Sequence, residues 1–117
     1  MTIAREQLKT MDFSDVATGN RLAPVHPGDV LMHDFIKPLG ITRYKVAKLA
    51  GVQQRRIDEI CAGQRAITAD TALRLARLFG VDAAFWINLQ AQYDLEVSYR
   101  DMHERIEAEV TPLALAA

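Results

Sequence analysis

Four glycines divide the middle of the chain into short segments. Before each glycine, apolar residues recur about every three to four positions, which is the period of an amphipathic helix. No segment alternates with the period of two that would indicate a strand. Glycine commonly ends a helix, so each predicted helix is limited to a few turns. The four glycines are Gly40, Gly51, Gly63 and Gly80.

The predicted helices follow from signals at both ends of each segment. Pro27 suits a first helical turn, and Asp29 suits the positive end of a helix dipole. This first helix is expected to end before Pro38, because proline cannot continue the backbone ladder. Thr42 and Thr68 are good N-caps for two later helices. After the first helix, the predicted segments are 43–50, 53–62, 69–79, one from near residue 82, and an amphipathic stretch 95–110.

Five or six short helices joined by short loops predict an all-α orthogonal bundle. Residues 1–25 carry no sustained apolar period and are expected to form a partly irregular arm, with a helical turn near 4–11. A chain of 117 residues is one domain by length, and its hydrophobic half and charged quarter are ordinary for a globular protein. Neither a secretory signal nor a membrane-spanning run is recognisable.

One cysteine and three scattered histidines exclude several kinds of site. Cys61 has no second cysteine with which to form an internal disulfide or a metal knuckle, which favours a reducing cytoplasm and a packing role. His26, His33 and His103 are too far apart to indicate a metal site, and His26 is assigned to the start of the first helix. No cofactor is expected.

Charge is distributed unevenly along the sequence. The net charge is -1, but residues 43–65 hold six basic and two acidic side chains, a net +4. Residues 94–109 hold six acidic and two basic side chains, a net -4. A polyanion would be attracted to the first segment and repelled by the second, so the near-neutral total is compatible with nucleic-acid binding.

The basic segment has the spacing of two helices that meet at a steep angle. Such a pair needs a small residue where the backbones approach, which Ala47 supplies, and a turn residue that tolerates positive φ, which Gly51 supplies. An inward apolar set is expected to hold the pair against its neighbours: Val46, Ala50, Val52, Ile57 and Ile60.

The outward side of the second helix carries long polar side chains near its start. Glutamine pairs with adenine and arginine with guanine through two hydrogen bonds each, and each such contact discriminates by roughly 1–3 kcal/mol. Gln54 and Arg55 are the expected base readers, and Arg43 and Arg65 are the expected phosphate contacts. A cap or a phosphate contact suits Gln53 as well as base reading does, because it lies at the helix N-terminus. The predicted DNA-binding set is Arg43, Gln53, Gln54, Arg55, Arg56, Glu59 and Arg65.

Two other groups of residues leave alternatives open. Arg55 and Arg56 could form a plain solvated helix face, although the spacing of Ala47, Gly51 and Ile57 favours DNA. Aromatic residues at helical spacing usually pack in a core or a subunit interface, and a ligand pocket is the lesser alternative. The residues expected in a core or dimer seam are Phe85, Trp86, Leu89 and Tyr93.

Residues 26 to about 93 resemble the Xre-type helix-turn-helix family, and within it the HigA/VapI-like antitoxin branch. The matching segments are HPGDVLMHDFI, ITRYKVAKLAGV and AITADTALRLARLFGVDAAFWINLQAQYDL. The resemblance implies a lambda-repressor-like bundle and a homodimer that binds a palindromic operator in its own promoter. It also implies a partner toxin, commonly a RelE-like protein that cleaves messenger RNA, and a bacterial cytoplasmic location. The recognition helix departs from the branch, because Gln53 stands where serine is usual.

The chain is thus expected to comprise an arm (1–25), a helix-turn-helix DNA-binding domain (26–94), and a C-terminal helix with a tail (95–117). Its expected function is that of an autoregulating repressor and antitoxin. A free-standing regulator without a toxin is the alternative. An enzyme is not expected, because no catalytic constellation or phosphate loop can be proposed. A protein-binding domain that has lost DNA binding is disfavoured by the basic segment.

Overall fold

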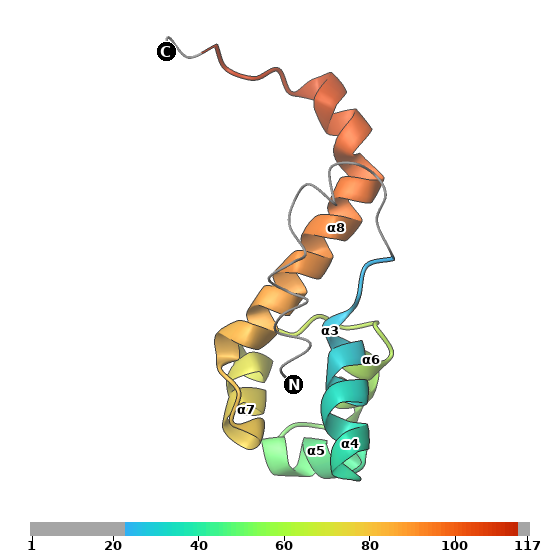
Figure 1. Ribbon diagram of the computed structural model, residues 1–117, viewed down its shortest axis with the longest axis vertical. Helices are drawn as coiled ribbons and strands as arrows, with labels where there is room; N and C mark the ends of the chain where they lie inside the picture. Colours follow the sequence, from blue (N-terminus) through green and yellow to red (C-terminus); the bar gives the residue numbers. More distant parts are fainter. Residues whose placement is uncertain (1–22, 115–117) are drawn as a thin grey trace.

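The computed structural model describes residues 23–114, and every regular element in that range is helical (Figure 1). Three short elements follow one another as a single rod, and four separate helices come after it. The elements are α3 (Pro27–Val30), η1 (Leu31–Ile36), α4 (Lys37–Leu39), α5 (Arg43–Ala50), α6 (Gln54–Cys61), α7 (Ala69–Phe79) and α8 (Ala83–Glu109). The predicted all-helical bundle is confirmed. The helical turn predicted near residues 4–11 lies outside the described residues.

Local signals set the bounds of α5 and α7, which match the predicted ranges. The Thr42 hydroxyl accepts a hydrogen bond from the Lys45 N–H at 3.0 Å, and Thr68 caps α7 in the same way. Gly51 ends α5 with φ +73°. Helix α6 is one residue shorter at each end than predicted, because Gln53 is its N-cap and Ala62 its C-cap.

The first rod continues through Pro38, so the expectation that it ends before this proline is wrong. Element η1 is a stretch of π-helix, in which the Lys37 N–H donates to the carbonyl of Met32, five residues back. Proline disrupts an α-helix because it lacks an N–H and its ring clashes with the carbonyl four residues earlier. We attribute the tolerance of Pro38 to the wider turn, which alters that ladder just before the proline. The rod ends at Gly40, one of the four glycines predicted to end helices.

Helix α8 is a single helix of 27 residues, which corrects the expectation of two separate helical segments. Asp82 caps its start by accepting a hydrogen bond from the Ala84 N–H at 3.1 Å. No glycine or proline occurs within the helix, so nothing in the local sequence interrupts it. The boundary predicted between residues 94 and 95 falls inside α8. The distal half of this helix, residues 95–109 and hereafter distal α8, extends away from the other helices (Figure 1).

The core lies between the first rod, the α5–α6 pair, α7 and the first turns of α8. Trp86 is fully buried there, with its ring 5.0 Å from that of Phe35. Phe85 and Leu89 pack half-buried against the same core. Tyr93 packs edge-on against His26 at 4.8 Å. The buried apolar residues are Leu31, Phe35, Ile36, Val46, Ala47, Ile57, Ile60, Ile67, Ala72, Leu75 and Trp86.

Two buried residues that the sequence did not single out fix the packing around α6. Gly28 lies against the backbone of α6, because a Cβ at this position would be 1.7 Å from the carbonyl oxygen of Ile60. Gln90 accepts a hydrogen bond from the Ile67 N–H at 2.8 Å and donates to Asp94 at 3.0 Å, which ties the α6–α7 loop to α8.

Within residues 23–114, no helix is long and apolar enough to cross a bilayer.

Candidate nucleic-acid interface

Helices α5 and α6 form the predicted helix-turn-helix. Val46 and Ala47 of α5 and Ile57 and Ile60 of α6 are buried, so the two helices share one apolar seam. The remaining members of the predicted inward set, Ala50 and Val52, are half-buried. The Val52 N–H donates to the Ala47 carbonyl at 3.0 Å, which closes the turn beside Gly51. This arrangement leaves the opposite side of α6 exposed.

The N-terminal end of α6 presents three exposed side chains. Gln53 and Gln54 are exposed, and the Gln53 side chain makes no capping hydrogen bond. Arg55 is the most accessible of the predicted basic residues, with 81% of its side chain exposed. Its Nε lies 3.2 Å from Glu59 one turn later, a surface pair that holds the guanidinium only weakly. These amide and guanidinium groups are therefore available to base edges.

Glu59 lies between two arginines. Its carboxylate oxygens lie 3.2 Å from Nε of Arg55 and 2.7 Å from Nη2 of Arg65. Hydrogen bonds from Arg65 and then from Arg55 lower the pKa of Glu59, so the carboxylate stays charged well below neutral pH. Glu59 thus joins the predicted base reader Arg55 to the predicted phosphate contact Arg65.

Arg43 and Arg65 each pair with a carboxylate of α6. Arg43 begins α5, and its Nε lies 3.4 Å from Asp58 of α6. Arg65 follows α6 in the loop. Both arginines keep nearly half of the side chain exposed, 49% and 45% respectively. Each is anchored at one side while part of its guanidinium remains open to an anion.

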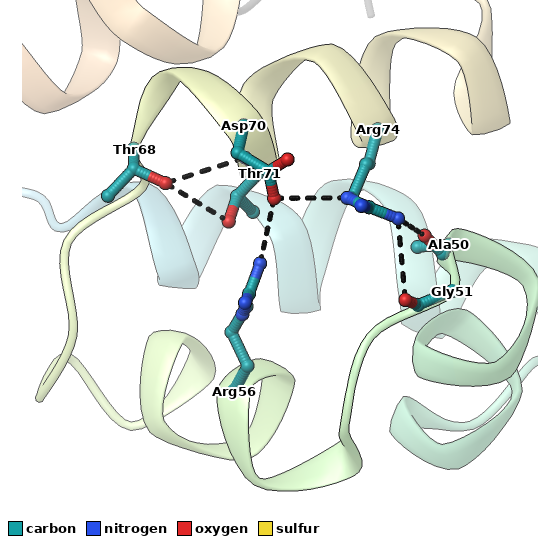
Figure 2. A network of polar contacts seen from close by, with 7 residues as sticks. All are labelled: Ala50, Gly51, Arg56, Thr68, Asp70, Thr71 and Arg74. Carbon is teal, nitrogen blue, oxygen red and sulfur yellow. Dashed lines mark hydrogen bonds and ion pairs between the residues drawn. The ribbon is translucent and has the colours of Figure 1, made fainter.

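Arg56 differs from its neighbour Arg55, although the sequence grouped the two. Its Nη1 donates to Asp70 of α7 at 2.9 Å, and Arg74 donates to the same carboxylate oxygen at 3.0 Å (Figure 2). Successive residues on a helix point about 100° apart, so Arg56 faces α7 while Arg55 faces outward. The i,i+4 spacing of Asp70 and Arg74 was the only local signal of this network.

Cys61 is half-buried at the end of α6. Burial raises the pKa of its thiol to about 11, so the thiol stays protonated at neutral pH. A protonated thiol is a poor nucleophile, which fits the packing role expected from the sequence.

Known proteins share this arrangement. A family model described as "Helix-turn-helix" matches residues 33–86. Virulence-associated protein I of Dichelobacter nodosus is 46% identical over 82 residues, covering 70% of this chain and 76% of that protein. Antitoxin HigA-1 of Vibrio cholerae is 35% identical over 72 residues, covering 62% of this chain and 68% of that protein.

A solved structure of the Pseudomonas aeruginosa antitoxin HigA with the higBA promoter matches with a TM-score of 0.75 and 38% identity. The match covers 77% of this chain and 98% of that one. The chain belongs to the HigA family of helix-turn-helix antitoxins. The resemblance seen in the sequence is thereby confirmed. In helix-turn-helix proteins the second helix of the motif is the recognition helix, and α6 occupies that position in this HigA-family chain.

Proposed function

We propose that this HigA-family chain represses its own promoter by placing α6 in the major groove of an operator. The observation that carries the proposal is the exposed group formed by Gln53, Gln54 and Arg55 at the N-terminal end of α6. Helix-turn-helix proteins contact base edges with the first residues of the recognition helix. The HigA relative solved with the higBA promoter supports the binding of promoter DNA.

Five exposed residues of the motif and of the loop that follows it have proposed roles. Gln54 and Arg55 read base edges through paired hydrogen bonds, which discriminate by roughly 1–3 kcal/mol per contact. Arg43 and Arg65 bind phosphates on either side of the groove. Gln53, at the N-cap position, contacts the backbone of the duplex, where helix N–H groups favour an anion.

The operator complex requires a homodimer, because one recognition helix reads only a few base pairs. Two-fold pairing places two such helices in successive major grooves, about 34 Å apart. We assign the dimer contact to the distal half of α8, since Phe85 and Trp86 of the predicted seam pack against the core of their own chain. Leu95, Met102 and Ile106 are exposed, and their spacing of seven and four residues gives them a common helix face.

The proposed protein partner is a small basic toxin of the RelE-like class, which cleaves messenger RNA. An RNA-binding surface is basic, and distal α8 is rich in exposed carboxylates that would complement it. The N-terminal arm, residues 1–25, is the other candidate contact. A free-standing regulator without a toxin remains the alternative, and a toxin reading frame beside this gene would decide for the antitoxin. We expect no catalytic activity and a bacterial cytoplasmic location.

The test is a fluorescence-anisotropy titration of the purified chain at two salt concentrations. The duplexes are the promoter fragment upstream of its own coding sequence and a scrambled fragment of equal length. Tight binding with clear preference for the promoter, weakened by salt, is the expected result. Equal weak binding to both duplexes would contradict the proposed repressor function.

A further inference from the structure

Asp70 of α7 joins two arginines that come from different helices (Figure 2). Its Oδ2 accepts hydrogen bonds from Nη1 of Arg56 on α6 at 2.9 Å and from Nε of Arg74 on α7 at 3.0 Å. The hydrogen bond from Arg74 and then that from Arg56 lower the pKa of Asp70, so the bridging group is a carboxylate at neutral pH. One oxygen atom therefore links the recognition helix to α7.

Arg74 extends the same network to the end of α5. Its Nη1 donates to the carbonyl of Ala50 at 2.9 Å and to that of Gly51 at 3.3 Å (Figure 2). Carbonyls in the last turn of a helix have no partner within the helix, so they are free to accept these bonds. A Cβ on Gly51 would lie only 3.1 Å from this Nη1, so the turn approaches Arg74 closely. The network thus connects α7 to both helices of the motif and to the turn between them.

We propose that Arg56, Asp70 and Arg74 form a brace that sets the angle of α6 relative to α5, and that Arg56 serves operator recognition as a positioning residue. This inference rests on the proposed operator binding. Helix α6 has only two fully buried side chains, Ile57 and Ile60, to hold it in place. Base contacts require placement to within about half an ångström, which a brace of fixed guanidinium geometry can supply.

The Asp70 and Arg74 side chains of the brace are exposed, so substitutions there can alter operator recognition without unfolding the chain. More than half of the Asp70 side chain and about two fifths of the Arg74 side chain are accessible. Exposed ion pairs contribute little to stability. Substitutions in the brace should therefore leave the chain folded, and any loss of operator preference can be assigned to the orientation of α6.

A direct contact of Arg56 with DNA and a positioning role of Arg56 predict different effects of replacing Asp70. Replacing its carboxylate removes a negative charge beside α6 and frees Arg56, which should strengthen binding to every duplex if Arg56 contacts DNA directly. A positioning role predicts that binding to the operator weakens relative to a scrambled duplex. The ratio of the two affinities therefore distinguishes the roles, whereas either affinity alone does not.

The experiment uses the full chain and the two duplexes already described, with Asp70→Asn and Arg74→Lys as variants. Lysine keeps the charge of Arg74 but cannot bridge a carboxylate and two carbonyls with one planar group. We expect each variant to lower the promoter-to-scrambled affinity ratio about tenfold, with the melting temperature nearly unchanged. The matched control is Asp101→Asn, which removes the same charge from an exposed pair with Arg100 on distal α8.

A double-mutant cycle tests whether Arg56 acts through Asp70. Combining Arg56→Ala with Asp70→Asn should lower the ratio no further than either change alone, because both remove the same link. A ratio left unchanged by Asp70→Asn and Arg74→Lys, or additive effects in the cycle, would overturn the proposed brace and leave the proposed operator binding intact. A wild-type chain without promoter preference would overturn the proposed function and this inference together.

Discussion

At the scale of single residues, adjacent side chains on α6 have different surroundings. Among residues 23–114, Arg55 is exposed and pairs with Glu59 alone, while Arg56 turns back to Asp70. Gln53 and Gln54 extend the exposed group by two residues at the helix start. This contrast divides the motif into side chains that are free to meet DNA and side chains already held within the protein.

The first prediction concerns the proposed base reader. Arg55→Ala should weaken promoter binding by about 1–3 kcal/mol and relax sequence preference, because a paired contact to a base edge is lost. Arg43→Ala is the matched comparison. It should weaken binding to promoter and scrambled duplexes alike and reduce the salt dependence by about one counterion. Anisotropy titrations over a salt series measure both effects, and unchanged promoter preference in Arg55→Ala would refute the assignment.

A second prediction concerns Gly28, where the first rod touches the backbone of α6. Gly28→Ala places a methyl group 1.7 Å from the Ile60 carbonyl oxygen, so the two elements must move apart. We expect a loss of roughly 1–3 kcal/mol in the free energy of unfolding, as is usual for overpacking. Urea denaturation followed by circular dichroism measures this loss. An unchanged midpoint would show that α3 and α6 can separate at no cost.

At the scale of elements, α5 and α7 begin and end at residues that the sequence identified. Their bounds depend on a threonine cap and a glycine stop, which act within one or two turns of the chain. The first rod and α8 are each longer than predicted, because the helical backbone continues past the position where the sequence predicted an end. A π-helical stretch carries the rod through Pro38, and α8 meets no interruption between Ala83 and Glu109.

The third prediction concerns distal α8 as the dimer contact. Met102→Glu should lower the dimer fraction and, with it, promoter affinity, because a buried charge would oppose its symmetry mate across the seam. Ala108→Glu adds the same charge on the opposite face of the helix and should change neither. Sedimentation equilibrium measures the dimer fraction. A dimer unaffected by Met102→Glu would place the subunit contact elsewhere.

At the scale of the whole molecule, His26 connects the start of the first rod to α8. Its Nδ1 accepts a hydrogen bond from the Gly28 N–H at 2.9 Å, and its ring packs on Tyr93. Accepting at Nδ1 requires the neutral ring. Burial lowers the pKa of His26 below 6.5, although Asp29 and Asp94 act in the opposite direction. The folded chain therefore binds this proton less readily than the unfolded chain does.

The fourth prediction is a loss of stability in mild acid. Because the folded pKa of His26 is lowered, its contribution is complete above the unfolded value of 6.5 and declines as the pH falls below it. Melting temperatures recorded from about pH 8 to about pH 5 should be constant at first and then decrease as the pH drops below 6.5. His26→Asn keeps a capping oxygen without a titrating ring, so its decline should be smaller. Equal declines in both proteins would exclude His26 as the source.

The sequence by itself determined the helical class, the bounds of α5 and α7, and the motif built on Ala47 and Gly51. These features depend on caps, stops and periodicity, which act between residues a few positions apart. It also indicated which face of α6 is exposed, because the amphipathic period sets the outward face of a helix.

Only the tertiary structure decided which of those residues are free. Arg56 and Asp70 are 14 residues apart in sequence, and Arg74 reaches carbonyls 23 and 24 residues away. Gly28 likewise lies against the backbone of Ile60, which belongs to a separate helix. Such contacts arise when separate helices pack, and no local pattern specifies which side chains will then lie within hydrogen-bonding distance.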